Sequence, residues 1–318
     1  MRAVFASRDG WTIRSAPDPE PGPDQVLVRI RASGVCRNDL HKREGIPGHE
    51  PAGEIVAVGS SVRDRKVGDR VGVMLWQSSC GRCEWCSRGK MLFCEEVIGT
   101  SLGTPGSHAD LMVAPARATV LLPDALSFEQ AGSLFCAGYT AYAGLRAANP
   151  RPGDRIAVVG VGGVGHMAVQ YAKASGFETI ALSRNPAKDP LIRSLGADEV
   201  LRDGEALRLA GGADVILGTA ASATAQADAL RGLRPEGRFV VMGMEMEPIP
   251  VPIGSLIMKR ATIIGSQHND PAHLHEALAV AARGRVRVMT ETYPIEEAET
   301  VRRRLMTGDI RFRAVLTT

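Results

Sequence analysis

The chain reads RIAVVGVGGVG from Arg155 to Gly165. Residues 155–159 are mostly apolar and predict a buried strand, and residues 166–175 predict a helix. A G-x-G-x-x-G loop that joins a strand to a helix is the fingerprint of a dinucleotide-binding unit. The alternative interpretation is a glycine turn without a ligand, because the motif on its own is a weak signal.

The glycines of this loop have separate expected roles. Gly160 permits a tight turn, Gly162 lets the backbone approach a pyrophosphate, and Gly165 lets the helix pack closely on the strand. The anion would then lie at the helix N-terminus, beside Gly163 and Val164.

From about residue 125 onward, helical and strand patterns alternate. Ser127 and Gln130 match a capping box, which predicts the start of a helix. Further strands are predicted at 179–182, 214–217, 238–242 and 261–264. This alternation predicts an α/β fold with a doubly wound parallel sheet of the Rossmann type.

The first 120 residues have a different pattern, because short apolar runs are punctuated there by Gly and Pro. They predict a β-rich domain, and the closing strand at 313–316 is expected to return to it. We therefore expect a discontinuous catalytic domain over 1–121 and 288–318 and a Rossmann dinucleotide-binding domain over 122–287.

Composition narrows the class of protein. The 318 residues carry a net charge of only +3 and the arginines are scattered, which argues against a nucleic-acid partner. The N-terminus has no apolar signal segment and no run approaches a membrane span, so we expect a cytoplasmic protein without a membrane partner. The expected partner is a small-molecule substrate.

Four of the six cysteines lie close together, at Cys80, Cys83, Cys86 and Cys94. The spacing C-x2-C-x2-C-x7-C lets four thiolates close around one ion, as in structural zinc sites. Disulfides are disfavoured in a cytoplasmic chain. An iron–sulfur cluster is a further alternative, but its bacterial pattern continues with a shorter last gap and a proline. A zinc-finger module for nucleic acid would need a basic recognition helix, which this loop lacks.

The other two cysteines, Cys36 and Cys136, lie on either side of Gly48-His49-Glu50 in the sequence. Soft thiolates and an imidazole suit a second zinc ion, with a coordination position left open for water or substrate. Taken singly, each cysteine could instead be a buried free thiol.

Residues 182–185 read Leu-Ser-Arg-Asn at the end of the second strand of the nucleotide unit. NAD sites usually carry an acidic residue there, which bonds the ribose 2′-hydroxyl. Ser183 can instead hydrogen-bond a 2′-phosphate and Arg184 can pair with it, so we expect NADP(H). The alternative is that Arg184 points to solvent while another residue contacts the ribose.

Together these motifs resemble the medium-chain zinc-dependent alcohol dehydrogenase family over almost the whole chain. The resemblance rests on CRNDLH at 36–41, GHE at 48–50, the four-cysteine loop, CAGYT at 136–140, the glycine loop and LGAD at 195–198. It implies a GroES-like β domain that carries two zinc ions per chain, and a Rossmann domain that binds the cofactor in the cleft between them.

By this resemblance, Cys36, His49 and Cys136 hold the catalytic zinc, with Glu50 nearby as a supporting or exchangeable ligand. Thr140 resembles the threonine that packs near the nicotinamide. The implied activity is that of an NADPH-preferring oxidoreductase, which transfers a hydride between the cofactor and a carbonyl or alcohol. A non-catalytic zinc- and nucleotide-binding protein is the alternative from another class, although complete zinc ligands argue against it.

Asn38 departs from the family pattern, which has Ser or Thr there to pass the alcohol proton onward, often toward a histidine such as His41. An amide cannot readily shuttle a proton, although Asp39 and His41 remain. The reaction could therefore be reduction of a conjugated C=C bond or an iminium, as in a reductive cyclase. The alternative is that water or His41 takes over the relay and carbonyl reduction is retained.

The segment between Cys36 and His49 is shorter than is usual in the family, which would open the cleft to a bulky substrate such as a secondary metabolite. Trp76, Gln77 and Phe135 are candidates for the pocket lining, although Trp76 could equally belong to the core. Family members pair through the edge of the nucleotide sheet, here near 261–265, so a homodimer or homotetramer is expected.

Overall fold

The computed structural model describes residues 1–244, 246–268 and 270–318. It has two compact units, one formed by Met1–Cys136 with Val288–Thr318 and the other by Ala137–Arg287. The boundary at Cys136 lies later than the expected position 121. The reason is that helix α2 (Phe128–Ser133) packs on strands β3 (Gln25–Val35) and β4 (Glu50–Val58) of the first unit.

The first unit is built on a seven-stranded mixed sheet with the order β16-β17-β3-β4-β5-β9, in which β8 also pairs with β3. The pairs β1-β2 and β6-β7 form two further small sheets. The remaining strands are β1 (Arg2–Ala6), β2 (Trp11–Ser15), β5 (Arg70–Val73), β6 (Trp76–Ser78), β7 (Ile98–Gly99), β8 (Leu111–Pro115), β9 (Thr119–Leu121), β16 (Thr290–Pro294) and β17 (Arg313–Thr317). The helical segments are η1 (Arg37–His41), α1 (Glu84–Ser87), η2 (Met91–Phe93), η3 (Ala116–Ala118), η4 (Leu134–Gly138), η7 (Ile295–Glu297) and α10 (Ala298–Thr307).

Strand β3 is the central strand of the first unit. Its first half alternates between core and surface, so that Val26, Val28 and Ile30 are fully buried in the core. The last four residues, Ala32 to Val35, are all buried, since β4 and β17 pair with the two edges of β3 there and helix α2 packs on β3. The C-terminal strand therefore returns to the first unit, as the sequence predicts.

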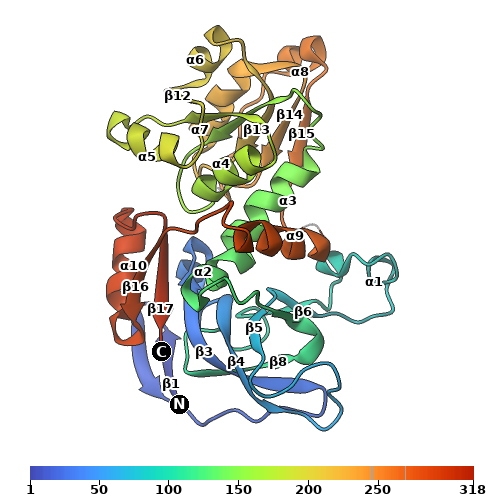
Figure 1. Cartoon of the computed structure of the whole chain (residues 1–318), viewed down its shortest axis with the longest axis vertical. Helices are drawn as coiled ribbons and strands as arrows, with labels where there is room; N and C mark the ends of the chain where they lie inside the picture. The colour runs from blue at the N-terminus through green and yellow to red at the C-terminus, as the bar shows by residue number, and fades with distance from the viewer. Residues whose placement is uncertain (245, 269) are drawn as a thin grey trace. The chain divides into compact units, whose positions relative to one another are not determined.

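The second unit contains a six-stranded parallel sheet with the order β12-β11-β10-β13-β14-β15 (Figure 1). This order is that of a doubly wound Rossmann fold and confirms the expected fold class. The strands are β10 (Arg155–Val159), β11 (Glu178–Leu182), β12 (Glu199–Leu201), β13 (Ala213–Gly218), β14 (Leu233–Val241) and β15 (Thr262–Gly265). The helical segments are α3 (Tyr139–Ala147), α4 (Gly165–Ala174), η5 (Pro186–Lys188), α5 (Asp189–Ser194), α6 (Gly204–Leu209), α7 (Ala223–Ala229), η6 (Leu230–Gly232), α8 (Ile253–Lys259) and α9 (Pro271–Ala282).

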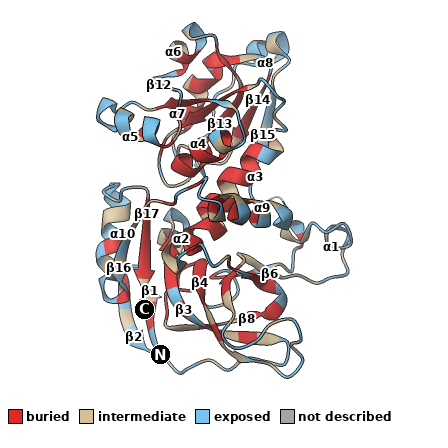
Figure 2. Ribbon diagram, viewed as in Figure 1, coloured by how far each residue is buried: buried red, intermediate tan, exposed pale blue. Residues whose placement is uncertain are grey.

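The middle of this sheet is buried, as the red colour of β13 and β14 in Figure 2 shows. All residues of β10 are buried, since this strand has a neighbour on each side and helices α4 and α7 pack against it. The N-terminus of α2 is capped as predicted, because the Ser127 hydroxyl accepts a hydrogen bond from the Gln130 amide. In the part of the chain that the structure describes, no helix has the length and apolar character needed to cross a bilayer.

Candidate functional site

Four residues with metal-ligating side chains converge beside the C-terminal end of β3. Cys36 directly follows β3, His49 and Glu50 stand at the start of β4, and Cys136 lies in the short π-helical segment η4. One candidate ligand atom of each residue lies within 4.8 Å of those of the other three. The structure therefore brings together all four residues that the sequence places around a catalytic metal.

The register of the sheet produces this convergence. Gly34 on β3 lies opposite Glu50 on β4, and a Cβ atom at Gly34 would lie 2.1 Å from the Glu50 Oε2 atom. Only glycine leaves room for the carboxylate there. On the other side of β3, Val35 lies opposite Ala314 of β17, which brings Arg313 to the same place.

Arg313 is a member of the site that sequence reasoning missed. Both carboxylate oxygens of Glu50 are within hydrogen-bond distance of its Nη2 atom, and both side chains are buried. Burial raises the pKa of Glu50 to about 7, although Arg313 lowers it. Both oxygens face the same guanidinium nitrogen, so Arg313 holds Glu50 in place beside the ligand atoms.

Asp39 orients His49. The His49 Nδ1 atom lies 2.7 Å from Asp39 Oδ1, and the His49 Nε2 atom lies 3.4 Å from the Cys136 sulfur. The Cys36 amide donates to Asp39 Oδ2 at 2.8 Å. Burial raises the pKa of Asp39, but His49 and hydrogen bonds outweigh it and hold that pKa below its usual value. A carboxylate on one imidazole nitrogen leaves the other free for a metal.

The two thiols of this group lie within hydrogen-bond distance of each other. Their sulfur atoms lie 4.0 Å apart, and the hydrogen bond from Cys136 holds the pKa of Cys36 well below its usual value. The same interaction, together with burial, raises the pKa of Cys136. Two sulfurs and one imidazole nitrogen match the donor set of a catalytic zinc site that keeps one position open.

The four-cysteine loop forms a second group. Cys80, Cys83, Cys86 and Cys94 lie around α1 and η2, with one sulfur of each within 4.8 Å of the others. The Cys83 amide approaches the Cys80 sulfur at 3.4 Å. A hydrogen bond with Ser79 is the main cause that lowers the pKa of Cys86, to about 7. Four converging sulfurs fit a closed tetrahedral zinc site.

The remaining residues of the expected catalytic group lie in η1. Asn38 and His41 are exposed, whereas Asp39 is buried. The short segment that follows is anchored at two points. The Lys42 ammonium group donates to the Ser101 carbonyl at 2.7 Å, and the Gly45 carbonyl accepts from the Ala6 amide at 2.9 Å.

Two of the three residues expected to line the pocket are buried. Phe135 is 1% exposed and packs against Gly72, where a Cβ atom would lie 2.2 Å from the ring. Gln77 is buried and donates to the Thr100 hydroxyl at 2.8 Å. Both residues therefore belong to the core of the first unit, while Trp76 is partly exposed. Sequence alone could not distinguish these cases, because all three flank motif residues.

The glycine loop has the geometry expected from its motif. Gly160 has a φ of 83°, and a Cβ atom at Gly165 would lie 1.9 Å from the Gly160 carbonyl oxygen. A Cβ atom at Gly162 would meet no atom within 4 Å, so the backbone is open there. Gly163 and Val164 lead directly into α4. Thr140 lies in the first turn of α3 and is partly exposed.

The end of β11 carries a further pair of charges. Ser183 donates its amide to Leu201, and Arg184 is exposed. Arg202, which the sequence did not single out, donates to the Ser183 carbonyl at 2.8 Å and pairs with Asp189. The nearby carboxylate of Asp189 is thus neutralised by an arginine.

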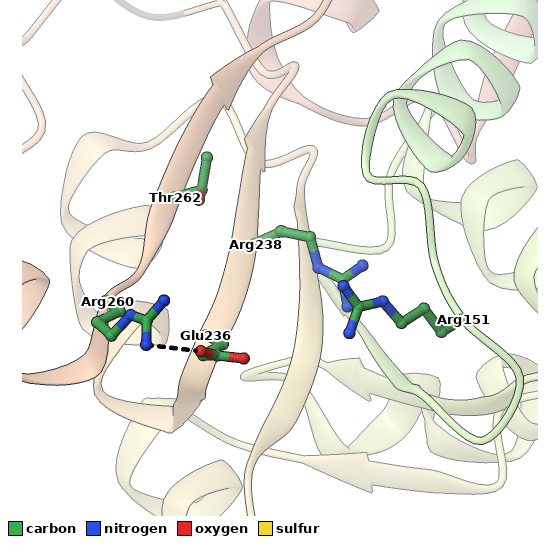
Figure 3. A pocket seen from close by; sticks show the side chains of 5 residues that line it. All are labelled: Arg151, Glu236, Arg238, Arg260 and Thr262. Carbon is green, nitrogen blue, oxygen red and sulfur yellow. Dashed lines mark ion pairs between the residues drawn. The ribbon is translucent and has the colours of Figure 1, made fainter.

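A surface pocket of the second unit lies away from the glycine loop. Figure 3 shows its lining, which includes Arg151, Arg238 and the ion pair between Glu236 and Arg260 at 3.3 Å. These residues stand at the amino ends of the parallel strands. Because ligands of such sheets bind outside the carboxyl ends, this pocket is not the nucleotide site.

Comparison with known proteins relates both units of the chain to alcohol dehydrogenases. Residues 22–124 match the alcohol dehydrogenase GroES-like domain, and residues 163–283 match the zinc-binding dehydrogenase family. An alcohol dehydrogenase of Geobacillus stearothermophilus is 38% identical over 96% of this chain and 95% of its own length. One of Rhizobium meliloti is 37% identical over 96% and 94%. The solved cinnamyl alcohol dehydrogenase of Sorghum bicolor has a TM-score of 0.91 at 29% identity, covering 99% of this chain and 97% of that one.

We predict that Cys83→Ser lowers the zinc content by one ion per chain and the melting temperature by roughly 10 °C, because a bound ion stabilises the fold that binds it. Zinc content and a thermal melt measure this. Glu95→Gln, an exposed neighbour of Cys94, is the control and should leave both unchanged. Unaltered zinc content in Cys83→Ser would contradict a metal site in this loop.

Proposed function

We propose that this chain, which belongs to the medium-chain zinc-dependent alcohol dehydrogenase family, is an NADPH-preferring oxidoreductase with two zinc ions. It would transfer a hydride between the nicotinamide and a carbonyl or alcohol substrate. The convergence of Cys36, His49 and Cys136 carries the proposal, because this donor set fits a metal site with an open position. The Rossmann sheet and its glycine loop supply the expected place for a nicotinamide cofactor.

The residues of the site would have different roles. Cys36, His49 and Cys136 would hold the zinc, which when bound supplies Lewis-acid polarisation of a substrate oxygen. Asp39 keeps the Nδ1 proton of His49 in place, so that Nε2 faces the two sulfurs. Arg313 keeps Glu50 beside them and compensates its buried charge.

The preference for NADPH rests on charge at the end of β11. Ser183 and Arg184 lie where NAD sites usually place an acidic residue. The nearby carboxylate of Asp189 is paired with Arg202 and so presents little repulsion to a 2′-phosphate. Arg184 is exposed, so its guanidinium group is available to pair with a phosphate.

Arg184→Leu should raise the KM for NADPH by about 10- to 100-fold and leave the KM for NADH nearly unchanged, because it removes one charge-assisted hydrogen bond to the 2′-phosphate. Steady-state kinetics with both cofactors provide the measurement. Lys188→Gln, which removes an exposed positive charge in η5, is the control and should alter neither constant. Equal KM values for the two cofactors in the unaltered enzyme would refute the preference.

The departure at Asn38 supports a second candidate reaction. Asn38 is exposed in η1 and offers an amide where the family has a hydroxyl that relays a proton. Hydride transfer to the carbon of a conjugated C=C bond or an iminium does not need that relay. A reductase of such bonds, including a reductive cyclase, is therefore the alternative, and the short anchored segment after His41 is compatible with a bulky substrate.

With NADPH deuterated at the transferred position and cinnamaldehyde as substrate, we predict that deuterium appears on the carbonyl carbon of the product, as read by NMR. This is the carbon whose oxygen a Lewis acid polarises. Deuterium on the β-carbon would instead establish conjugate reduction and reject the carbonyl assignment.

A pair of variants at position 38 complements this experiment. If Asn38 is a substituted relay residue, Asn38→Thr should raise kcat for a simple primary alcohol at least tenfold, since positioned proton transfer contributes about 10²–10⁴ in rate. Asn38→Ala is the matched control and should give no such gain. Equal kcat values for the two variants would show that the absence of a hydroxyl at position 38 does not limit alcohol oxidation.

We also propose that two copies of the chain pair through β15. This strand is at the edge of the six-stranded sheet, and Ile263 on it is 40% exposed. Ile257 and Met258 of the neighbouring helix α8 are also exposed. An unpaired edge with apolar neighbours is a surface that proteins normally cover.

Ile263→Lys should weaken self-association at least tenfold, because a charge at the strand edge opposes pairing. Light scattering over a dilution series measures the mass, which we expect to fall toward that of one chain. Leu209→Lys is the control, because it places the same charge at another exposed apolar residue, which is 71% exposed, and it should leave the mass unchanged. A monomeric unaltered protein would contradict the proposal.

A further inference from the structure

His108 lies behind the metal-ligating group, and no motif identified it. It is fully buried in the segment between β7 and β8. Its Nε2 atom points at Asp39 Oδ2 from 3.7 Å and has no hydrogen-bond partner among the described residues. Asp39 in turn holds His49. A buried polar atom beside a buried carboxylate needs an explanation, because burial without a partner is costly.

The other ring nitrogen determines which proton His108 carries. Its Nδ1 atom lies 2.8 Å from the Ser33 hydroxyl, which lies 2.7 Å from the Ser107 hydroxyl. If Ser107 donates to Ser33 and Ser33 donates to Nδ1, the ring proton is on Nε2 and faces the carboxylate. The opposite tautomer would place a lone pair against the charge of Asp39. The electrostatics therefore favour the Nε2–H form.

The ring of His108 is held rigidly. The backbone of 107–108 is bonded to the segment before His49, with Ser107 donating to the Gly48 carbonyl at 2.9 Å and His108 to that of Pro47 at 3.0 Å. A Cβ atom at Gly48 would lie 2.4 Å from the His108 Nδ1 atom, so the ring packs directly on this glycine. Trp11 packs on the ring at a centroid distance of 5.4 Å.

We propose that His108 is a positioning residue for the metal centre, which donates from Nε2 toward Asp39 and so holds the carboxylate against His49. The order of contacts would be Ser107, Ser33, His108, Asp39 and His49. Asp39 then faces a donor at each oxygen: His49 and the Cys36 amide are hydrogen-bonded to Oδ1 and Oδ2, and His108 Nε2 stands 3.7 Å from Oδ2. This inference rests on the proposed role of His49 as a zinc ligand.

Two substitutions separate positioning from packing. His108→Phe keeps a ring of similar size and removes both nitrogens, whereas His108→Gln places an amide N–H near the position of Nε2. In the zinc-loaded protein, His108→Phe should release zinc from the site of Cys36 to a chromogenic chelator about 10- to 100-fold faster, which is the usual effect of losing an outer contact of a ligating histidine. His108→Gln should stay within about threefold of the unaltered protein.

The four-cysteine site provides an internal reference, since its release rate should be equal in all variants. The phase that belongs to the other site is identified as the one absent in Cys36→Ser. Equal release from the two His108 variants, or an unaltered rate in His108→Phe, would overturn the positioning role. If the unaltered protein itself shows only the four-cysteine phase, then the proposed catalytic zinc fails, and this inference fails with it.

A double-mutant cycle tests whether His108 acts through Asp39. In an Asp39→Asn background, His108→Phe should change zinc release by less than about twofold, because the contact that it removes has already been altered. If His108→Phe instead speeds zinc release by the same factor with Asp39 and with Asn at position 39, His108 acts by another route. That result would contradict the proposed order of contacts.

Discussion

The antiparallel pairing of β3 with β4 and β17 is the constraint on which the metal-ligating group depends. It places Gly34 opposite Glu50 and Val35 opposite Ala314, so that residues far apart in the sequence meet beside Cys36. A slip of one residue in either pair would turn the side chains of that strand to the opposite face. Val26, Val28 and Ile30 of β3 would then leave the core, so the register is strongly determined.

The sequence predicted the parts of the structure that local patterns encode. The apolar run before Gly160 and the glycines themselves specify strand, turn and helix within a few residues, and the structure has each of them. The four-cysteine loop is similarly local, with its sulfurs within fifteen positions of one another in the printed sequence and within 4.8 Å in space. These features depend only on residues close together in the chain, so the spacing of those residues in the sequence is enough to predict them.

Contacts across long sequence separations were not predictable in this way. Arg313 meets Glu50 only because β17 returns to β3, and His108 reaches Asp39 only because the segment before β8 folds over Gly48. Neither arginine nor histidine is unusual at an isolated position, so composition gives no signal. Phe135 shows the converse, since its place next to Cys136 in the sequence suggested a pocket position, whereas its ring packs against Gly72 in the core.

The buried polar groups of the first unit therefore act as one network. Imidazoles, two carboxylates and one guanidinium are buried there beside two partly buried thiols, and each has an opposite charge or a hydrogen-bond partner. Such a group is expensive to assemble without an ion, because thiolates and carboxylates would repel one another. A bound divalent cation would compensate that charge and links the fold of this unit to the chemistry that we propose.

Anomalous diffraction at the zinc absorption edge, from crystals grown without chelator, tests the central claim most directly. The account predicts two peaks per chain, one among the sulfurs of the four-cysteine loop and one surrounded by Cys36, His49 and Cys136. A single peak at the four-cysteine loop, with Cys36 and Cys136 bearing no metal, would contradict it.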